Sequence, residues 1–214
     1  MLSGRVYGTL LNHRTALEAL GASVNEAPYK APPKAPVLFI KPRNTLAGNG
    51  AIVTVPRDTE ELEIGAALGV VIGRTACKVS EGSALDFVAG YLIVNDVSVP
   101  HASYYRPSVR HKARDGFCPL GPRVVPRDSV ADPDALQVRV YVDNQLRQTT
   151  STSELIRSVP RLLADVTDFM TLAPGDVLAV GTAAPAPRAR AGQHVAIEID
   201  QVGRLESSFV GEQT

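Results

Sequence analysis

The sequence predicts an α+β fold that is mainly β, and three observations lead to that prediction. Short apolar or alternating segments recur along the 214 residues, most of them bounded by Gly, Pro, Asn or Asp, as is typical of strands and turns. Only two or three segments have helical spacing. Strands and helices do not alternate regularly, which argues against a doubly wound parallel sheet. We therefore expect a single domain over residues 1–214 with a few short helices.

The first half of the chain contains most of the predicted strands. The continuous apolar run at 64–72 is expected to be buried on both faces. Residues 25–36 hold four of the sixteen prolines and predict a loop. Strands are expected at 5–11, 37–40, 52–55, 64–72 and 91–94, and short helices at 15–20 and 83–89, the second ended by Gly90.

The second half predicts a hairpin, one amphipathic helix and three further strands. Residues 137–142 alternate valines with polar residues, and Asp143-Asn144 follows as a hairpin turn. An apolar stripe from Leu155 to Met170 predicts a helix with its N-cap among residues 151–153. Pro160 inside that stripe predicts a kink or a late start. The remaining strands are expected at 177–180, 195–199 and 205–210, the last pairing back across Val202-Gly203.

Composition excludes several classes of partner. The 22 basic and 22 acidic residues balance, which argues against nucleic acid as the main partner. No apolar run approaches the roughly 20 residues that span a bilayer, so no membrane association is expected. The N-terminus lacks the continuous apolar core of a signal peptide, which favours the cytoplasm. Cys77 and Cys118 have no metal-type spacing and are expected to be free, buried thiols.

Polar and cationic side chains concentrate after the predicted strand at 91–94. That strand ends in Asn95-Asp96, and strand ends often carry small-molecule chemistry because a stiff element fixes the side chain. In a chain without net charge, the local concentration of cations is suited to a small anion. The cluster comprises His101, Tyr104, Tyr105, Arg106, Arg110, His111, Lys112, Arg114 and Asp115.

Seven ordered strings resemble the fumarylacetoacetate hydrolase family over nearly the whole chain. One of them, FIKPRNT, and two further strings, LNHR and YKAPPK, are most similar to the N-terminal half of bifunctional decarboxylase/isomerases of 4-hydroxyphenylacetate degradation. The resemblance implies a mixed β-roll or sandwich, with residues 1–50 as a lid that contacts substrate and residues 51–214 as the core. The seven strings are FIKPRNT (39–45), LGVVIG (68–73), AGYLIVNDVS (89–98), YYRP (104–107), KARDGFCPLGP (112–122), FMTLAPGDVLAVGT (169–182) and VGRLESSFV (202–210).

The chemistry that this resemblance implies depends on a divalent cation. In the family three carboxylates hold Mg²⁺ or Mn²⁺, and the ion chelates the 2-oxo group and the neighbouring carboxylate of the substrate. Lysine and arginine side chains complete the site, and a histidine–carboxylate pair near the N-terminus moves protons. The implied substrates are 2-oxo or 2-hydroxy dienoates with two or three carboxylates.

The expected metal ligands are only partly present. Asp96 matches the third carboxylate of the family, whereas Gly65 and Ala67 stand where the first two glutamates belong. Glu61 and Glu63 have the right spacing but lie four residues early, about 13 Å along a strand. One carboxylate does not satisfy a cation that takes about six oxygen ligands. The sequence therefore predicts a degenerate site in which Mg²⁺ or Mn²⁺ is weakly bound or absent.

The histidine–carboxylate pair is also altered. His13 stands at the family's tyrosine position, and alanines occupy the histidine and glutamate positions. His13 with Glu18 is a candidate substitute pair, and an ordinary surface histidine is the alternative.

Four further positions carry over to the pocket. Lys112 matches the lysine of the KARDGFCPLGP string and is the predicted catalytic and anion-binding residue; the alternative is a solvated basic loop. Lys41, Arg106 and Thr182 match substrate-contact positions. Cys118 is interpreted as a buried apolar residue rather than a nucleophile.

Three functions remain open at this stage. The chain is a subunit of the decarboxylase/isomerase, or a catalytically silent subunit that stabilises a metal-binding homologue, or a relative that hydrolyses an acylpyruvate or hydrates a dienoate. The third is less favoured because those reactions also depend on the ion. In each case we expect a homodimer, or a heterodimer with a homologue that binds metal.

Overall fold

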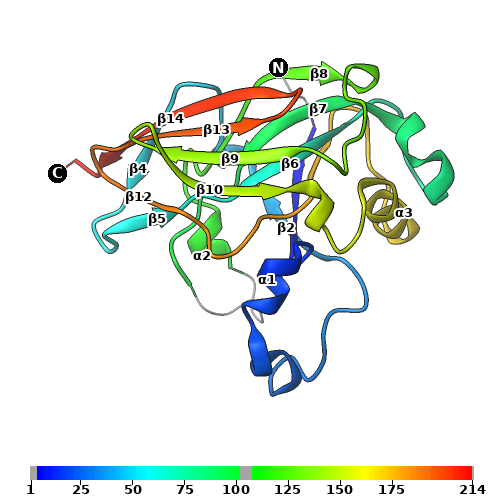
Figure 1. Cartoon of the computed structure of the whole chain (residues 1–214), viewed down its shortest axis with the longest axis horizontal. Coiled ribbons are helices and arrows are strands. Elements are labelled where there is room, and N and C mark those ends of the chain that lie inside the picture. Colours follow the sequence, from blue (N-terminus) through cyan, green and yellow to red (C-terminus); the bar gives the residue numbers. More distant parts are fainter. Residues whose placement is uncertain (1–3, 102–107, 214) are drawn as a thin grey trace.

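Two β-sheets share one apolar core and carry the rest of the chain (Figure 1). The computed structural model describes residues 4–101 and 108–213. The first sheet has seven strands in the order β2-β1-β11-β6-β7-β8-β3, and the second has five in the order β10-β9-β13-β14-β4. A separate pair, β12-β5, completes the strands of the described residues. This architecture confirms the predicted mainly β, α+β class.

The strands are short, as the turn residues between them predict. Those of the seven-stranded sheet are β1 (Val6–Leu10), β2 (Val37–Lys41), β3 (Leu46–Ala47), β6 (Ala66–Ile72), β7 (Val88–Asn95), β8 (Cys118–Pro126) and β11 (Val177–Ala179). Those of the five-stranded sheet are β4 (Ala51–Val55), β9 (Gln137–Val142), β10 (Gln145–Ser151), β13 (His194–Ile199) and β14 (Gly203–Gly211). The separate pair consists of β5 (Glu61–Glu63) and β12 (Arg188–Arg190).

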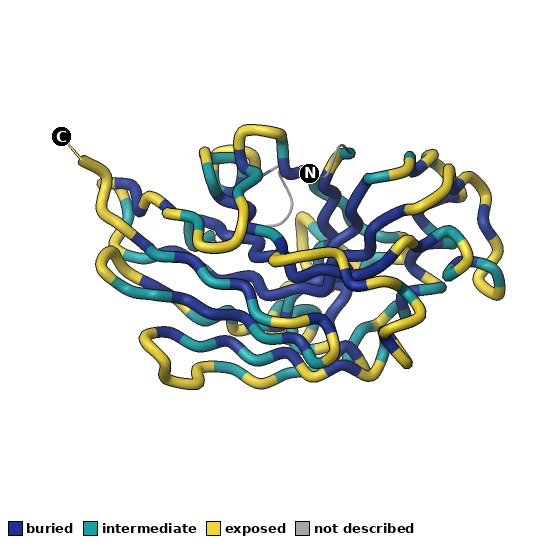
Figure 2. The backbone as a smooth tube through the Cα atoms, turned by 90° about the horizontal axis from the view of Figure 1, so that it is seen from above, coloured by how far each residue is buried: buried dark blue, intermediate teal, exposed yellow. Residues whose placement is uncertain are grey.

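Strand β6 is buried along its whole length, as its continuous apolar run predicts. Leu68 and Val70 belong to the core that the two sheets share, whereas Ala67 and Val71 belong to a second cluster. Successive side chains of a strand alternate between faces, so the second cluster lies on the outer face of the seven-stranded sheet. Figure 2 shows burial concentrated in the middle of the strands and exposure in the loops that join them.

The main helix, α3 (Val159–Phe169), starts later than its apolar stripe, which confirms one of the two outcomes predicted from Pro160. Ser158 is the N-cap and accepts a hydrogen bond from the Arg161 backbone N–H. The N-cap predicted among residues 151–153 is wrong, because those residues end β10 and begin a 3₁₀ turn.

Several other predictions need correction. The helix expected at 83–89 is a 3₁₀ helix, Glu81–Phe87, and Gly90 lies inside β7 rather than ending the helix. Strands β3, β5, β8 and β12 were not predicted. The hairpin turn at Asp143-Asn144 is confirmed, with φ values of 50° and 62°. Further 3₁₀ segments are Gly21–Asn25, Arg43–Thr45, Arg127–Ser129 and Thr152–Glu154.

The N-terminal region contributes two strands to the seven-stranded sheet, and the segment between these strands projects away from it (Figure 1). Strands β1 and β2 pair with each other, and β1 pairs with β11 inside the seven-stranded sheet. Between them, α1 (Arg14–Glu18) and a 3₁₀ helix (Gly21–Asn25) project away from the sheets with the proline-rich loop (Figure 1). Whether residues 1–50 act as a lid stays a prediction.

Two properties of the described residues bear on the expected class of protein. None of their helices is long and apolar enough to cross a membrane. Both cysteines are free thiols; Cys118 is buried as predicted, but Cys77 is exposed.

Candidate functional site

The candidate site is built around Asp96, which directly follows β7 on the outer face of the seven-stranded sheet. Strand pairing holds this position, because the Asp96 backbone N–H donates to the Gly65 carbonyl at 2.8 Å. The carboxylate is buried and contacts two ammonium groups. Lys41 Nζ lies 2.7 Å from Asp96 Oδ1, and Lys112 Nζ donates to Asp96 Oδ2 at 2.6 Å.

Lys41 joins three segments of the site. Its ammonium donates to the backbone carbonyls of Val97, Lys112 and Phe117 at 2.8–2.9 Å. These bonds use all three N–H donors, so the contact with Asp96 is a Coulombic pair. The residue is 2% exposed. Its surroundings favour a positioning role over the predicted contact with substrate.

Lys112 is bound less completely. It lies at the end of a short helix, α2 (Val109–Lys112), and its ammonium stacks 4.7 Å from the centre of the Phe39 ring. One of its three N–H donors binds Asp96, and the other two have no hydrogen-bond partner among the described residues. Because Lys112 is 6% exposed, the alternative of a solvated basic loop is wrong for this side chain.

The electrostatics of the cluster favour an anion. Burial raises the pKa of Asp96, but the ammoniums of Lys112 and Lys41 outweigh it, and the net direction is down. Burial lowers the pKa of Lys41 despite the attraction of Asp96. Two cations therefore share one carboxylate in a desolvated place. The surplus positive charge would be stabilised by a second anion.

The residues present do not fit the family's divalent cation. A Cβ atom on Gly65 would lie 2.6 Å from the Asp96 carbonyl oxygen, so the position of the first family glutamate has no room for a side chain. Ala67, at the second position, supplies no oxygen. Among the described residues no group of three or more His, Cys, Asp and Glu side chains could hold a metal ion.

The two upstream glutamates have other partners. Arg188 donates to Glu61 at 2.7 Å, and its other terminal nitrogen lies 3.7 Å from Glu63. Both glutamates belong to β5, and β5 pairs with β12, which carries Arg188. Burial raises the pKa of Glu63 because it disfavours the ionised carboxylate, and the negative charge of Asp96 raises this pKa further. Glu61 and Glu63 therefore lie against Arg188 of β12, whereas the Asp96 carboxylate lies against the ammoniums of Lys41 and Lys112.

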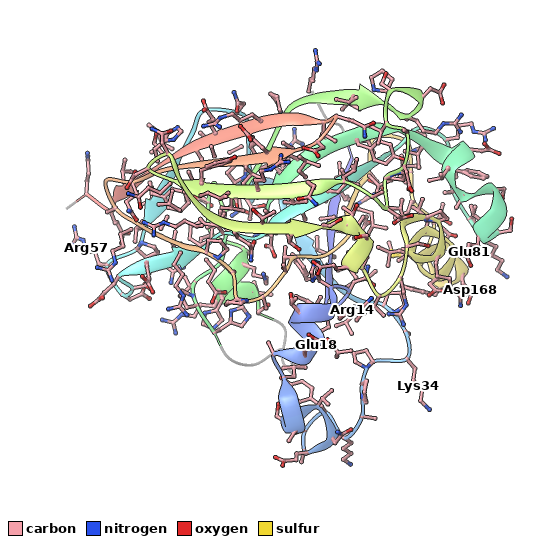
Figure 3. The ribbon with its side chains drawn as sticks, viewed as in Figure 1. Arg14, Glu18, Lys34, Arg57, Glu81 and Asp168 are labelled. Atoms are coloured by element: carbon pink, nitrogen blue, oxygen red, sulfur yellow. The ribbon has the colours of Figure 1, made fainter. Side chains whose placement is uncertain are left out.

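His13 is buried, which contradicts the surface-histidine alternative, but its partner is not Glu18. His13 Nε2 lies 2.9 Å from Thr150 Oγ1 and 3.5 Å from Glu154, and Thr150 donates to the same carboxylate. Glu18 is exposed on α1, in the projecting part of the chain (Figure 3). The predicted His13–Glu18 pair is wrong for this reason.

The surroundings of His13 give it a structural role. Its Nδ1 accepts from the Thr15 backbone N–H and so caps α1, and its backbone bridges to Leu155. A cavity of about 10 Å³ beside it, lined also by Gly181 and Ala183, is the size of one water molecule. No contact joins His13 to Asp96 or Lys112 among the described residues.

Arg106 and Thr182 are the two remaining predicted contacts. Arg106 lies outside the described residues. Thr182 is half-buried beyond the end of β11, and within the described part of the chain no hydrogen bond joins it to Asp96, Lys41 or Lys112. Their roles in binding stay predictions. Cys118 is buried, and burial raises the pKa of its thiol to about 12, so it is not a nucleophile at neutral pH.

Sequence reasoning noted two histidines in the cationic cluster without giving them a role. The imidazoles of His101 and His111 stack with their centres 4.9 Å apart and their planes 4° from parallel. The available signal was their presence on both sides of the YYRP string. It could not show that the chain returns to bring the two rings together.

Comparison with known proteins identifies the relatives of this chain. The family model described as fumarylacetoacetate hydrolase C-terminal matches residues 5–210. A 4-hydroxyphenylacetate degradation bifunctional isomerase/decarboxylase of Escherichia coli is 36% identical over 212 residues, which cover 99% of this chain and 48% of that protein. The chain thus spans about half the length of this relative and of similar curated relatives.

Solved structures agree with this assignment. A 5-carboxymethyl-2-hydroxymuconate delta-isomerase from Mycobacterium smegmatis is 31% identical with a TM-score of 0.85, over 100% of this chain and 81% of that one. A maleylpyruvate hydrolase from Sphingobium, solved with manganese(II) and pyruvate, is 30% identical with a TM-score of 0.81, over 98% and 71%. Similar folds therefore include an isomerase and a manganese-bound hydrolase.

Proposed function

Because this chain belongs to the fumarylacetoacetate hydrolase family, we propose that it is a subunit of a decarboxylase/isomerase of aromatic catabolism. The proposed substrates are 5-carboxymethyl-2-oxo-hex-3-ene-1,7-dioate and 2-hydroxyhepta-2,4-diene-1,7-dioate, the compounds of 4-hydroxyphenylacetate degradation. Both carry several carboxylates and a 2-oxo or 2-hydroxy group. The cationic cluster at Asp96 is suited to such an anion.

One observation carries this proposal: Lys112 is a buried ammonium, and two of its N–H donors have no hydrogen-bond partner in the described part of the chain. A substrate carboxylate or enolate oxygen would accept those donors and neutralise the surplus charge. Asp96 orients the ammonium through its 2.6 Å bond, and Lys41 fixes Asp96 and the backbone at Lys112. A hydrogen bond to an oxygen that gains charge during enolisation stabilises the enolate more than the ketone.

A metal ion has no role in this proposal, because Gly65 and Ala67 supply no ligands. In relatives that bind one, the cation stabilises the enolate. Here Lys112 is the group that remains for that task. Since the ammonium is a single charge, we expect slower turnover than in a metal-binding relative.

A second candidate is favoured by the same missing ligands at residues 65 and 67. This subunit would be catalytically silent and would stabilise a homologue that keeps its glutamates. Association, either with a second copy or with such a homologue, stays a prediction. Cytoplasmic localisation, the acylpyruvate hydrolase and dienoate hydratase activities also stay predictions.

The two candidates differ in the turnover of the isolated chain. The subunit proposal predicts slow conversion of the 2-oxo dienoate by this chain alone, lost in Lys112→Met and faster when a homologue with both glutamates is added. Lys78→Met, at an exposed lysine outside residues 1–50, is the matched control and should change nothing. Conversion that is absent without the homologue, and unaffected by Lys112→Met when it is present, would favour the silent subunit.

A further inference from the structure

The histidine pair lies beside the site and is not used by the proposed function. Two segments bring it together: the chain after β7 carries His101, and α2 carries His111 one residue before Lys112. The Val99 backbone N–H donates to the His111 carbonyl at 3.0 Å, which joins the two segments. The stacked rings therefore have a fixed place next to Lys112.

The hydrogen bond of His101 fixes its tautomer. His101 Nδ1 lies 3.0 Å from the Val99 carbonyl oxygen, and a carbonyl oxygen only accepts, so Nδ1 carries the proton. In the neutral ring the lone pair is then on Nε2. His101 is held as a base whose basic nitrogen is defined by the backbone.

The charges around the two rings differ. The electrostatic neighbours of His101 include Lys112 and Asp96 of the candidate site, whereas those of His111 include Arg110, Arg114 and Asp58. Burial lowers the pKa of both histidines, and Lys112 lowers that of His101 further. Both rings are therefore neutral at pH 7, and a neutral imidazole can accept a proton.

We propose that His101 is the proton-transfer residue of this site and that His111 positions it. The proposal rests on the proposed function, because it requires a 2-oxo acid bound at Lys112. It also fills a gap: the N-terminal His13 is engaged with Thr150 and caps α1, so it does not serve the Asp96–Lys112 site.

The step is an enolisation. His101 Nε2 takes a proton from the carbon next to the oxo group, and the electron pair of that C–H bond forms a carbon–carbon double bond. The π electrons of the C=O bond move to oxygen, and the resulting enolate oxygen pairs with the Lys112 ammonium. Return of the proton from His101 to a carbon of the conjugated system completes an isomerisation. No oxidant or further reactant is needed.

Solvent exchange tests this step without requiring the natural substrate. The full chain is incubated in D₂O with 2-oxoadipate, and proton NMR follows loss of the C3 signal, while calorimetry measures binding. Wild type should exchange faster than buffer. His101→Asn keeps a donor for the Val99 carbonyl but has no base, and should exchange at least about tenfold more slowly with a dissociation constant within about twofold of wild type.

Two variants separate positioning from proton transfer. His111→Phe keeps a stacked ring and should retain most of the exchange. His111→Ala removes the ring and should slow exchange. It should also shift the pH profile of exchange toward higher pH, because His101 becomes less buried and its pKa rises. His194→Asn, on β13 in the other sheet, is the matched control and should exchange as wild type does. His101→Gln replaces His101→Asn if the latter does not fold.

The possible results separate the two proposals. Exchange by His101→Asn at the wild-type rate, or wild-type exchange no faster than buffer despite binding, would overturn the role of His101 and leave anion binding at Lys112 intact. Absence of 2-oxoadipate binding by wild type would overturn the proposed function, and with it the role of His101.

Discussion

At the residue scale, the decisive feature is a carboxylate shared by two lysines of different character. Lys41 donates all three of its N–H groups to backbone carbonyls. Lys112 donates one N–H group to Asp96, and the other two have no partner within the residues that the structure describes. The first therefore holds the site together, and the second is free to bind. Sequence matching predicts that both lysines contact substrate, because the sequence does not show which lysine donates its hydrogen bonds to backbone carbonyls.

Replacement of Lys41 tests its positioning role. Lys41→Met leaves Asp96 with one cation and three carbonyls without their donor, so the free energy of unfolding should fall by about 3–5 kcal/mol. Urea denaturation measures this change. The matched variant Lys34→Met, at an exposed lysine, should keep the midpoint of wild type (Figure 3). Equal midpoints for the two variants would contradict the assignment.

At the element scale, the pairing of β6 with β7 decides what the site can hold. The register places Gly65 against Asp96 and pairs Ala66 with Asn95, so the two family glutamate positions do lie at the strand end that carries the carboxylate. The sequence alignment of these positions is thus supported by the fold. What is missing is ligand atoms and, at Gly65, the space for them.

Restoring the glutamates should not restore a metal site. In the double variant Gly65→Glu and Ala67→Glu, the new Cβ at residue 65 meets Asp96 at 2.6 Å, and both Asp96 oxygens already contact lysines. We expect no stoichiometric Mn²⁺ binding by calorimetry and a lower melting temperature. Ala67→Glu alone controls for the added charge. Tight Mn²⁺ binding by a stable double variant would show that the strand adapts.

The sequence predicts those elements whose apolar residues form a continuous run or recur with a clear period. The continuous run at β6 and the alternation of β9 were sufficient to predict strands, and the apolar stripe of α3 was sufficient to predict a helix. Strand β8 was missed because its sequence, CPLGPRVVP, has proline and glycine where strands usually have β-branched residues. The partner of His13 was missed because Glu154 is distant in sequence and only the fold brings it close.

At the scale of the whole molecule, buried histidines couple stability to pH. Burial lowers the pKa of His13, His101 and His111 from the usual 6.5. Below that value the unfolded chain binds protons that the folded chain does not yet bind, so protonation favours unfolding. Asp96 acts at much lower pH, because its pKa is below the ordinary carboxyl value and its contribution is lost only as pH falls through that range.

The free energy of unfolding should therefore be constant near neutral pH and fall as pH decreases below about 6.5. Urea denaturation at several pH values between about 5 and 8 measures this profile. In His13→Gln the slope should be smaller, since one of the three groups no longer titrates. A slope in His13→Gln equal to or larger than that of wild type would contradict the direction given for His13, because the comparison cancels the opposite contributions of Glu63 and Asp134, whose pKa values burial raises.

The most direct test of the central claim is a binding titration without metal. After treatment with a chelator, calorimetry with 2-oxoadipate should show binding that is unchanged by added Mn²⁺ and absent in Lys112→Met, because the ammonium is the group that receives the anion. Binding that appears only with Mn²⁺, or that persists in Lys112→Met, would contradict the claim.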